Sequence, residues 1–484
     1  MSKLKYLANN LALFSVSNFV TKILVFLLVP LYTNVLTKAE YGIADVFQVT
    51  LLLLVPALTV NMGEGALRFG IERGSDRSAI LKIGLKYTLR AAGAVALIAG
   101  IAAFFVKQDI RWYLLLFTIL FFTNALYEFL LLYYQGCERV KIVVAGSILS
   151  TLTIILSNLL FLLVLKIGLN GYLFSQMIAF GVASLTMLLL GTFGPRSDEE
   201  AKNGELKGTD PKELEKELLA YGKPLILYST GSWINNAADR YLVLYLCGAA
   251  VNGLYGVAYK IPAILMVFQR VFAQAWQMSA TKSYKDEDGE AFFSMMYGSY
   301  HTFMVIGCAA LILLLKPIAH FLFQKDFYEA WILVSPLLIS VIFGALTGFL
   351  GSICLAHKDA RSMGIATGIG AALNVGLNLL LIPRFGAMGA AIATAASYFT
   401  MYFMALLITR KYVKIRSRFV RDYLAYGLLI VESVVMIRAN RPAVGYGVAA
   451  AVLILLIVMH AKEVTRIFQK AMEILQGKKK EKVC

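Results

Sequence analysis

The sequence predicts an all-α protein whose helices cross a membrane about fourteen times. Composition is the first observation: 59% of the 484 residues are hydrophobic and 15% are charged, whereas a soluble globular chain carries about 25% charged residues. The second is that the apolar residues fall in successive runs of about 18 to 26, the length that a helix needs to cross a bilayer. The third is a polar pattern that occurs once in each half of the chain.

Each predicted span is one of these apolar runs, bounded by charged residues, glycine or proline. The predicted spans are residues 7–33, 43–67, 80–106, 112–135, 142–165, 172–193, 219–246, 254–277, 292–315, 331–355, 364–382, 389–409, 423–437 and 444–460. The first run is too long for the core of a signal peptide, so we expect it to remain in the mature protein.

Lysine and arginine are distributed unevenly between the loops that connect these spans. If the N-terminus is cytosolic, most basic residues outside the spans lie on the cytosolic side, among them Arg68, Arg139 and the basic residues of 410–421. Cytosolic loops carry an excess of Lys and Arg, so both termini are predicted to be cytosolic. The net charge of +17 then reflects topology and attraction to anionic membrane lipids, and nucleic-acid binding is not predicted.

A polar pattern in the first span recurs in the seventh. Each span carries three polar residues at i, i+3 and i+7, a spacing that places them on one helix face. The two sets are Ser15, Asn18, Lys22 and Ser232, Asn235, Asp239. Gly168 and Gly386 match at nearly the same offset. A repeat of six helices follows, and because six is even, both copies enter the membrane in the same direction, related by a pseudo-twofold axis along the membrane normal.

The repeat divides the chain into five predicted parts. They are an N-terminal lobe of six spans (1–194), a charged cytosolic linker with a short helix (195–218), a C-terminal lobe of six spans (219–411), two further spans (412–461) and a basic amphipathic cytosolic tail (462–484). Asp210 and Pro211 are typical of the start of the linker helix, as N-cap and first-turn proline.

Residue spacing gives no sign of a metal centre, a cofactor or an ATPase. The five cysteines lie far apart and no Gly-rich phosphate loop follows a strand. The histidines are equally dispersed: His301, His320, His357 and His460. We therefore expect a secondary transporter and not an enzyme.

Charged residues at membrane depth are the candidate functional groups. Lys22 is predicted to lie near the bilayer midplane, where a cation costs at least about 2.5 kcal/mol. It either lines a cavity that receives an anionic group or tethers a nearby carboxylate, and the recurrence of the polar pattern favours the cavity. The candidate substrate-binding residues are Lys22, Arg240, Lys260, Arg270, Arg68, Asn18 and Asn235.

Three carboxylates in the predicted spans are candidates for ion coupling or charge balance: Asp239, Glu128 and Glu64. Asp239 would either bind a proton or Na⁺ or neutralise Lys22 or Lys260. Glu64 is four residues before Arg68, so a structural ion pair is its favoured role. Glu128 has no basic residue at helical spacing on its own helix, which favours an exchangeable ion.

Several motifs carry a resemblance to a known family. They are residues 28–32 with 40–42, residues 239–240, 253–260, 274–276 and 327–331. With these motifs the chain resembles the polysaccharide transporter family of the MOP flippase superfamily, the Wzx-type repeat-unit flippases, from the first predicted span to the twelfth. The resemblance implies a MATE-like fold of two six-helix lobes plus two C-terminal helices.

The resemblance also implies a function. Such proteins move undecaprenyl-diphosphate-linked oligosaccharides across the bacterial cytoplasmic membrane by alternating access through a cationic cavity, for O-antigen, capsule or exopolysaccharide synthesis, with a polysaccharide polymerase as a possible partner. A lipid II or multidrug exporter of the same superfamily is the alternative. A membrane polysaccharide polymerase or ligase is disfavoured, because the longest predicted external segment has only about fifteen residues, too few for an independent domain.

Overall fold

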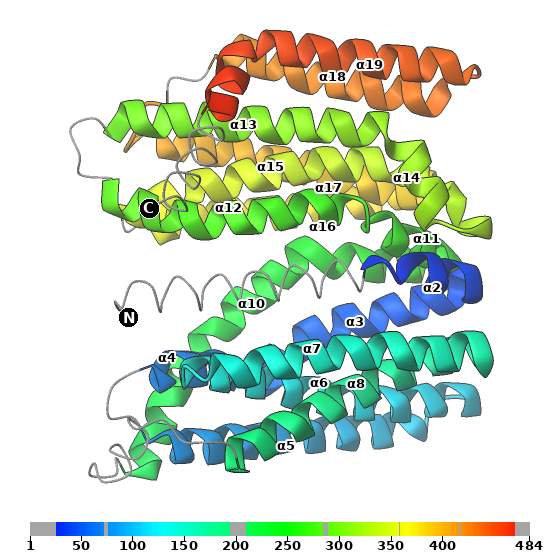
Figure 1. Cartoon of the computed structure of the whole chain (residues 1–484), viewed down its shortest axis with the longest axis vertical. Helices are drawn as coiled ribbons and strands as arrows, with labels where there is room; N and C mark the ends of the chain where they lie inside the picture. The colour runs from blue at the N-terminus through cyan, green and yellow to red at the C-terminus, as the bar shows by residue number, and fades with distance from the viewer. Residues whose placement is uncertain are drawn as a thin grey trace, which may run out of the picture. The chain divides into compact units, whose positions relative to one another are not determined.

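The computed structural model describes residues 26–71, 76–193, 210–283, 289–357, 359–415 and 418–469, and these residues form helices and connecting loops with no β-strand (Figure 1). The predicted all-α fold class is therefore confirmed. Contacts divide the chain into two compact units, Met1–Ala237 and Ala238–Cys484.

The first unit contains seven labelled α-helices up to residue 193 and the first part of α10. They are α2 (Val29–Val35), α3 (Lys38–Leu58), α4 (Met62–Gly70), α5 (Arg77–Ala103), α6 (Gln108–Gly136), α7 (Val140–Asn158), which continues into the π-helical turn η1 (Leu159–Val164), and α8 (Gly168–Phe193). Helix α3 begins with a capping box in which the Glu40 backbone N–H donates to Thr37 Oγ1 at 3.2 Å and the Thr37 backbone N–H donates to Glu40 Oε2 at 2.9 Å. The predicted second span is broken between α3 and α4, where Val60 and Asn61 have positive φ values of 54° and 51°.

Helix α10 (Pro211–Cys247) belongs to both units. It begins directly after Asp210, whose carboxylate accepts a hydrogen bond from the Lys212 backbone N–H at 3.0 Å, and it continues through Pro224 without a break. Its first turns are attached to α5, because Glu215 accepts hydrogen bonds from Lys86 Nζ at 2.7 and 2.8 Å and from the Tyr87 hydroxyl at 2.8 Å.

The second unit contains the remaining helices. They are α11 (Ala249–Ala258), α12 (Pro262–Ser283), α13 (Gly289–Leu313), α14 (Leu315–Leu322), the 3₁₀ turn η2 (Lys325–Ala330), α15 (Trp331–Ala356), α16 (Ala360–Phe385), α17 (Ala387–Thr409), α18 (Phe419–Arg438) and α19 (Pro442–Met459). Helix α15 is buried along most of its length and packs against α12, α13, α17 and α18 (Figure 1).

Two matched glycines support the internal duplication. Gly168 begins α8 and Gly386 precedes α17, the last helix of each predicted lobe, and both adopt positive φ, 52° and 58°. Only glycine adopts such backbone angles readily. The same residue type therefore stands at the start of the last helix in both halves, with positive φ in each.

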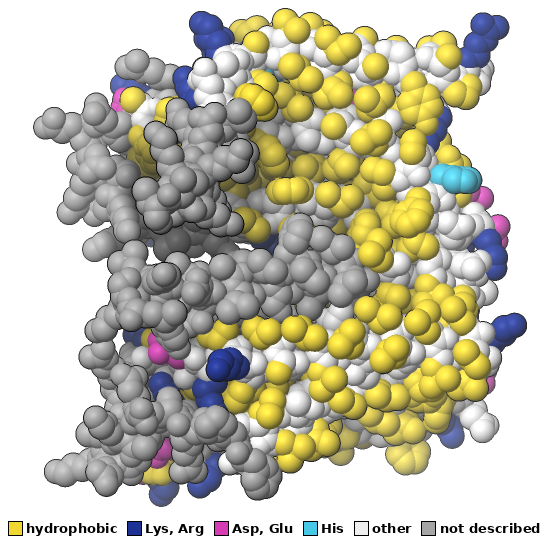
Figure 2. Space-filling view, in the orientation of Figure 1, with side chains coloured by type: hydrophobic (Ala, Val, Ile, Leu, Met, Phe, Trp, Pro, Cys, Tyr) yellow, Lys and Arg dark blue, Asp and Glu magenta, His cyan; other side chains and the backbone are white. Residues whose placement is uncertain are grey.

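Ten of the described helices are long and apolar enough to cross a membrane, or up to eleven if α11 and α12, bent by 50°, count as one span. The first predicted span lies largely outside the described residues, and α10 and α18 are not among the ten. The multi-pass character is confirmed, while the number fourteen remains a prediction. Each unit exposes hydrophobic side chains along its helices, with Lys and Arg side chains mainly near the helix ends (Figure 2), as expected for surfaces that contact lipid.

Candidate functional site

The predicted site residues occupy different environments. Lys22 and Asn18 lie outside the described residues, as does the side chain of Asn235. In the first unit, the side chains of Arg68 and Glu64 on α4 are exposed.

Three further predicted residues differ in exposure. Glu128 is exposed on α6 in the first unit. In the second unit, Arg270 is exposed on α12 and Lys260 is half-buried at the break between α11 and α12. The structure therefore singles out Asp239 and Arg240 for closer description.

Asp239 on α10 is 3% exposed and accepts several hydrogen bonds within the second unit. Its Oδ2 accepts from the hydroxyl groups of Tyr255, of Tyr259 at 3.1 Å and of Thr394 at 3.3 Å. Its Oδ1 accepts from the backbone N–H of Arg240 at 2.9 Å. Three hydroxyl donors thus converge on one buried carboxylate oxygen.

Two asparagines on α16 extend this group of polar side chains. Asn374 Nδ2 lies 3.5 Å from Thr394 Oγ1, and Asn378 Nδ2 donates to Asn374 Oδ1 at 2.9 Å. Asn378 is fully buried, and its Oδ1 has no hydrogen-bond partner among the described residues. We call the following set the Asp239 cluster: Asp239, Tyr255, Tyr259, Asn374, Asn378 and Thr394.

Helical spacing explains how four helices build the Asp239 cluster. Tyr255 and Tyr259 are four residues apart at the end of α11, and Asn374 and Asn378 are four residues apart on α16, so each pair lies on one helix face. The cluster offers carboxylate, amide and hydroxyl oxygens away from water. Such oxygens are the ligands that hard cations prefer, and a carboxylate is also the group that accepts a proton.

Arg240 is next to the Asp239 cluster. Its guanidinium carbon lies 4.7 Å from the ring centroid of Tyr259, a cation–π distance. Tyr259 therefore contacts both charged residues, through its hydroxyl to Asp239 and through its ring to Arg240. A change in the charge of Asp239 or Arg240 therefore affects the other residue directly.

Sequence reasoning identified Asp239 and Arg240 but not the neutral partners. The signal for Asn374 and Asn378 was their i, i+4 spacing inside a predicted apolar span. Thr394 offered no comparable signal, because a single threonine in a membrane helix commonly hydrogen-bonds its own backbone.

Comparison with known proteins places the chain in a family. The sequence profile of the polysaccharide biosynthesis protein family matches residues 7–277, more than half of the chain. The chain belongs to this family. The profile of the lipid II flippase MurJ matches residues 277–457.

Two curated relatives are membrane proteins. An uncharacterized membrane protein of Methanocaldococcus jannaschii is 24% identical over 440 residues, 82% of each chain. The uncharacterized membrane protein YabM of Bacillus subtilis is 26% identical over 236 residues, 46% of this chain and 44% of that protein.

Solved structures share the fold of this polysaccharide biosynthesis protein. The lipid II flippase MurJ in an inward closed conformation superposes with a TM-score of 0.68 at 15% identity, over 94% of this chain and 99% of the flippase. An inward-facing MATE multidrug transporter of the MOP superfamily superposes with a TM-score of 0.65 at 14% identity, over 84% of this chain and 95% of that transporter. The predicted MATE-like fold is confirmed.

Proposed function

We propose that this protein flips undecaprenyl-diphosphate-linked oligosaccharide repeat units across the bacterial cytoplasmic membrane for the synthesis of a surface polysaccharide. The observation that carries the proposal is the match of the polysaccharide biosynthesis family to residues 7–277, which include Arg240 and all the other predicted basic site residues. The transport mode is alternating access through a cationic cavity, with both termini in the cytosol and a polysaccharide polymerase as a downstream partner.

The charge of the substrate fits the basic residues of the second unit. A lipid diphosphate is anionic and binds cationic side chains strongly, above all arginine, whose planar group reaches two phosphate oxygens at once. Arg240 and Lys260 are both half-buried, so a phosphate beside them is less screened by water than at an exposed site. We assign the diphosphate to these residues, with Lys22 as a further cation from the first span.

The driving force is assigned to an ion gradient. The Asp239 cluster provides a buried carboxylate and neutral oxygens, which suit either a proton or Na⁺. Tyr259 links this cluster to Arg240. Ion binding at Asp239 therefore alters the field at Arg240, which is the physical requirement for coupling an ion to an anionic substrate.

Lipid II is the second candidate substrate, because the MurJ profile matches residues 277–457. Lipid II carries the same undecaprenyl diphosphate, so the same basic residues would serve it. The two substrates differ in the group attached to the diphosphate, for which the described residues show no defined binding group.

A vesicle assay tests both candidates. The purified full-length protein is reconstituted with a fluorescent undecaprenyl-diphosphate oligosaccharide or with fluorescent lipid II, and a membrane-impermeant quencher reports the fraction in the outer leaflet. We expect faster transbilayer exchange of the oligosaccharide lipid in vesicles with protein, and slower exchange with Arg240→Ala. Movement of lipid II alone would establish the second candidate, and movement of neither would contradict the proposal.

A further inference from the structure

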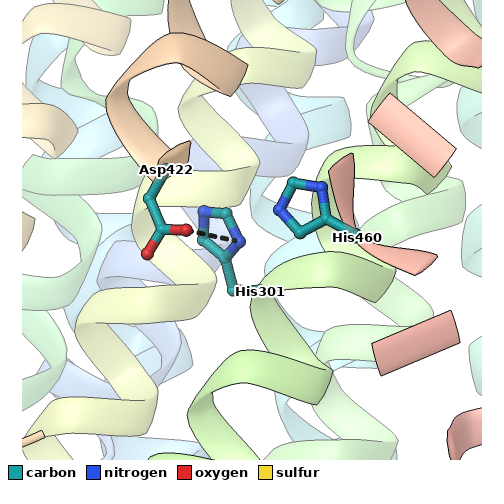
Figure 3. Close-up of side chains that lie close together, drawn as sticks. All are labelled: His301, Asp422 and His460. Atoms are coloured by element: carbon teal, nitrogen blue, oxygen red, sulfur yellow. Dashed lines mark ion pairs between the residues drawn. The ribbon is translucent and has the colours of Figure 1, made fainter. Parts of the chain in front are cut away.

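Three titratable side chains meet at one point of the second unit, apart from the Asp239 cluster. His301 comes from α13, Asp422 from the first turn of α18 and His460 from the residue after α19 (Figure 3). One ligand atom of each lies within 4.8 Å of the others, and the exposed fractions are 0%, 2% and 0%. The sequence predicted no metal centre, because these residues are far apart in the chain. Folding brings them together.

A hydrogen bond occupies one ring nitrogen of each histidine. His301 Nε2 lies 3.0 Å from the hydroxyl of Tyr426, which itself donates to the hydroxyl of Tyr402 at 3.4 Å. With Nε2 of His301 as the donor to Tyr426, its Nδ1 has only a lone pair, and this is the tautomer that can bind a metal ion through Nδ1. His460 Nδ1 donates to the carbonyl of Leu456 at 2.9 Å, which leaves the lone pair on Nε2.

Both lone-pair nitrogens are buried and have no hydrogen-bond partner among the described residues. His301 Nδ1 is 3.9 Å from Asp422 Oδ1, too far for a hydrogen bond (Figure 3). Buried nitrogens without partners are costly and call for an explanation. In metal sites, a ligating histidine commonly donates its other ring N–H to an oxygen, which is the arrangement of both His301 and His460.

We propose that His301, Asp422 and His460 bind a divalent transition-metal ion, with Zn²⁺ as the ion that this donor set favours. Two imidazole nitrogens and one carboxylate oxygen are typical zinc ligands at about 2.0 to 2.2 Å, and three protein ligands leave a fourth position for water. The three atoms must approach one another by roughly 1 Å to reach that geometry. Side-chain rotations supply this shift.

Asp422 is ion-paired and is reached by a cavity. Arg421 contacts Asp422 Oδ1 at 3.3 Å and Glu463 at 2.8 Å, so one cation is shared by two carboxylates before any metal binds. A cavity of about 320 Å³ reaches Asp422 and is lined by Ser294, Arg421 and Glu463 among others. The metal site therefore has a route to solvent, and Arg418 and Arg466 also line this route, so arginines outnumber the two carboxylates Asp422 and Glu463 there.

The role of the ion follows from the helices that it joins. Helices α18 and α19 form the C-terminal pair and contact α13, and the three ligands come from these three helices. A bound ion cross-links this pair to the rest of the second unit. We expect metal binding to raise the thermal stability of the full-length protein without being required for transport chemistry.

Cobalt spectroscopy of the full-length protein tests the site. The protein is purified in detergent with an affinity tag that contains no histidine, stripped with a chelator and titrated with Co²⁺. We expect one equivalent to produce the visible absorption of a tetrahedral ion, displaced by Zn²⁺, together with a higher Tm. His301→Ala and His460→Ala should each weaken binding at least about 100-fold, since the loss of an outer-shell partner alone costs about 10- to 100-fold.

Two further variants separate metal binding from packing. Tyr426→Phe keeps the aromatic volume and removes the oxygen that accepts from His301, so affinity should fall about 10- to 100-fold while the protein remains folded. His320→Ala, on the exposed part of α14, is the matched control and should bind as the wild type does. No stoichiometric Co²⁺ or Zn²⁺ binding by the wild type, or affinity unchanged in Tyr426→Phe and in a folded histidine variant, would overturn the proposal.

Discussion

Replacing Asp239 by asparagine removes the negative charge of the Asp239 cluster while keeping the side-chain shape. If the cluster binds Na⁺, the carboxylate supplies the main electrostatic attraction. A unit charge about 4 Å from a cation contributes about 4 kcal/mol at an effective dielectric constant of 20. That energy corresponds to an affinity loss of about 1,000-fold.

Asp239→Asn also disturbs the hydrogen bonds of the cluster, which lowers the free energy of unfolding. One amide oxygen can replace Oδ2 and accept from the three hydroxyl groups, but the amide NH₂ then faces the backbone N–H of Arg240. Leaving that donor without an acceptor costs about 1–3 kcal/mol. We therefore expect a lower Tm in Asp239→Asn, in addition to the loss of ion binding.

Thermal unfolding of the full-length protein in NaCl against choline chloride, at constant ionic strength and at several pH values, measures both effects. The wild type should be stabilised by Na⁺ or respond to pH, whereas Asp239→Asn should lose that response. Asp109→Asn, the same substitution at an exposed position of α6, is the matched control and should keep it. If the wild type responds to neither ion, or if Asp239→Asn responds as the wild type does, the assignment of Asp239 as the coupling residue is wrong.

Three further predictions concern Arg240, Tyr259 and the two matched glycines. Arg240→Ala should reduce export of the lipid-linked oligosaccharide at unchanged membrane abundance, with partial recovery in Arg240→Lys, since a cation still attracts the diphosphate without the two-point contact; wild-type export by the alanine variant would remove Arg240 from the site. Tyr259→Phe deletes one hydrogen bond to the Asp239 carboxylate, worth about 1.5–3 kcal/mol; because this donor stabilises the ion-free carboxylate, its loss should tighten proton binding about 10- to 150-fold in the pH series of the same unfolding assay; unchanged proton affinity would contradict this. Gly386→Ala should destabilise by about 1–3 kcal/mol through its backbone angles alone, and Gly168→Ala by more, because its Cβ would lie 2.7 Å from a carboxylate oxygen; equal Tm values for both variants and the wild type would refute the argument.

The sequence was sufficient for the features that depend on local pattern. Helical spans follow from apolar runs, and the positive φ shared by Gly168 and Gly386 follows from a repeated residue. Asp239 and Arg240 were identifiable because a charge at membrane depth is costly wherever it packs.

The remaining site residues depend on which helices become neighbours. Thr394 and Asn374 are ordinary polar residues in membrane helices until α17 and α16 bring them to Asp239. His301 and His460 were dismissed as a metal pair on the basis of spacing, and only the packing of α13 against α19 brings their lone pairs together. Such pairings are tertiary information that a single sequence does not contain.

Tyr259 contacts both Asp239 and Arg240, so the coupling between ion binding and diphosphate binding can be measured as a free energy. Its hydroxyl donates to Asp239 and its ring lies against Arg240, so an anion that draws Arg240 away removes a cation from the vicinity of the carboxylate. The field at Asp239 then becomes more favourable for Na⁺ or a proton. Coupling between two binding equilibria is reciprocal, so the factor by which a soluble diphosphate tightens ion binding must equal the factor by which the ion tightens diphosphate binding. Tyr259→Phe retains the ring contact and removes a donor that stabilises the ion-free carboxylate, and should therefore raise proton affinity while changing diphosphate affinity much less, whereas an equal loss of both would indicate that Tyr259 only supports the fold.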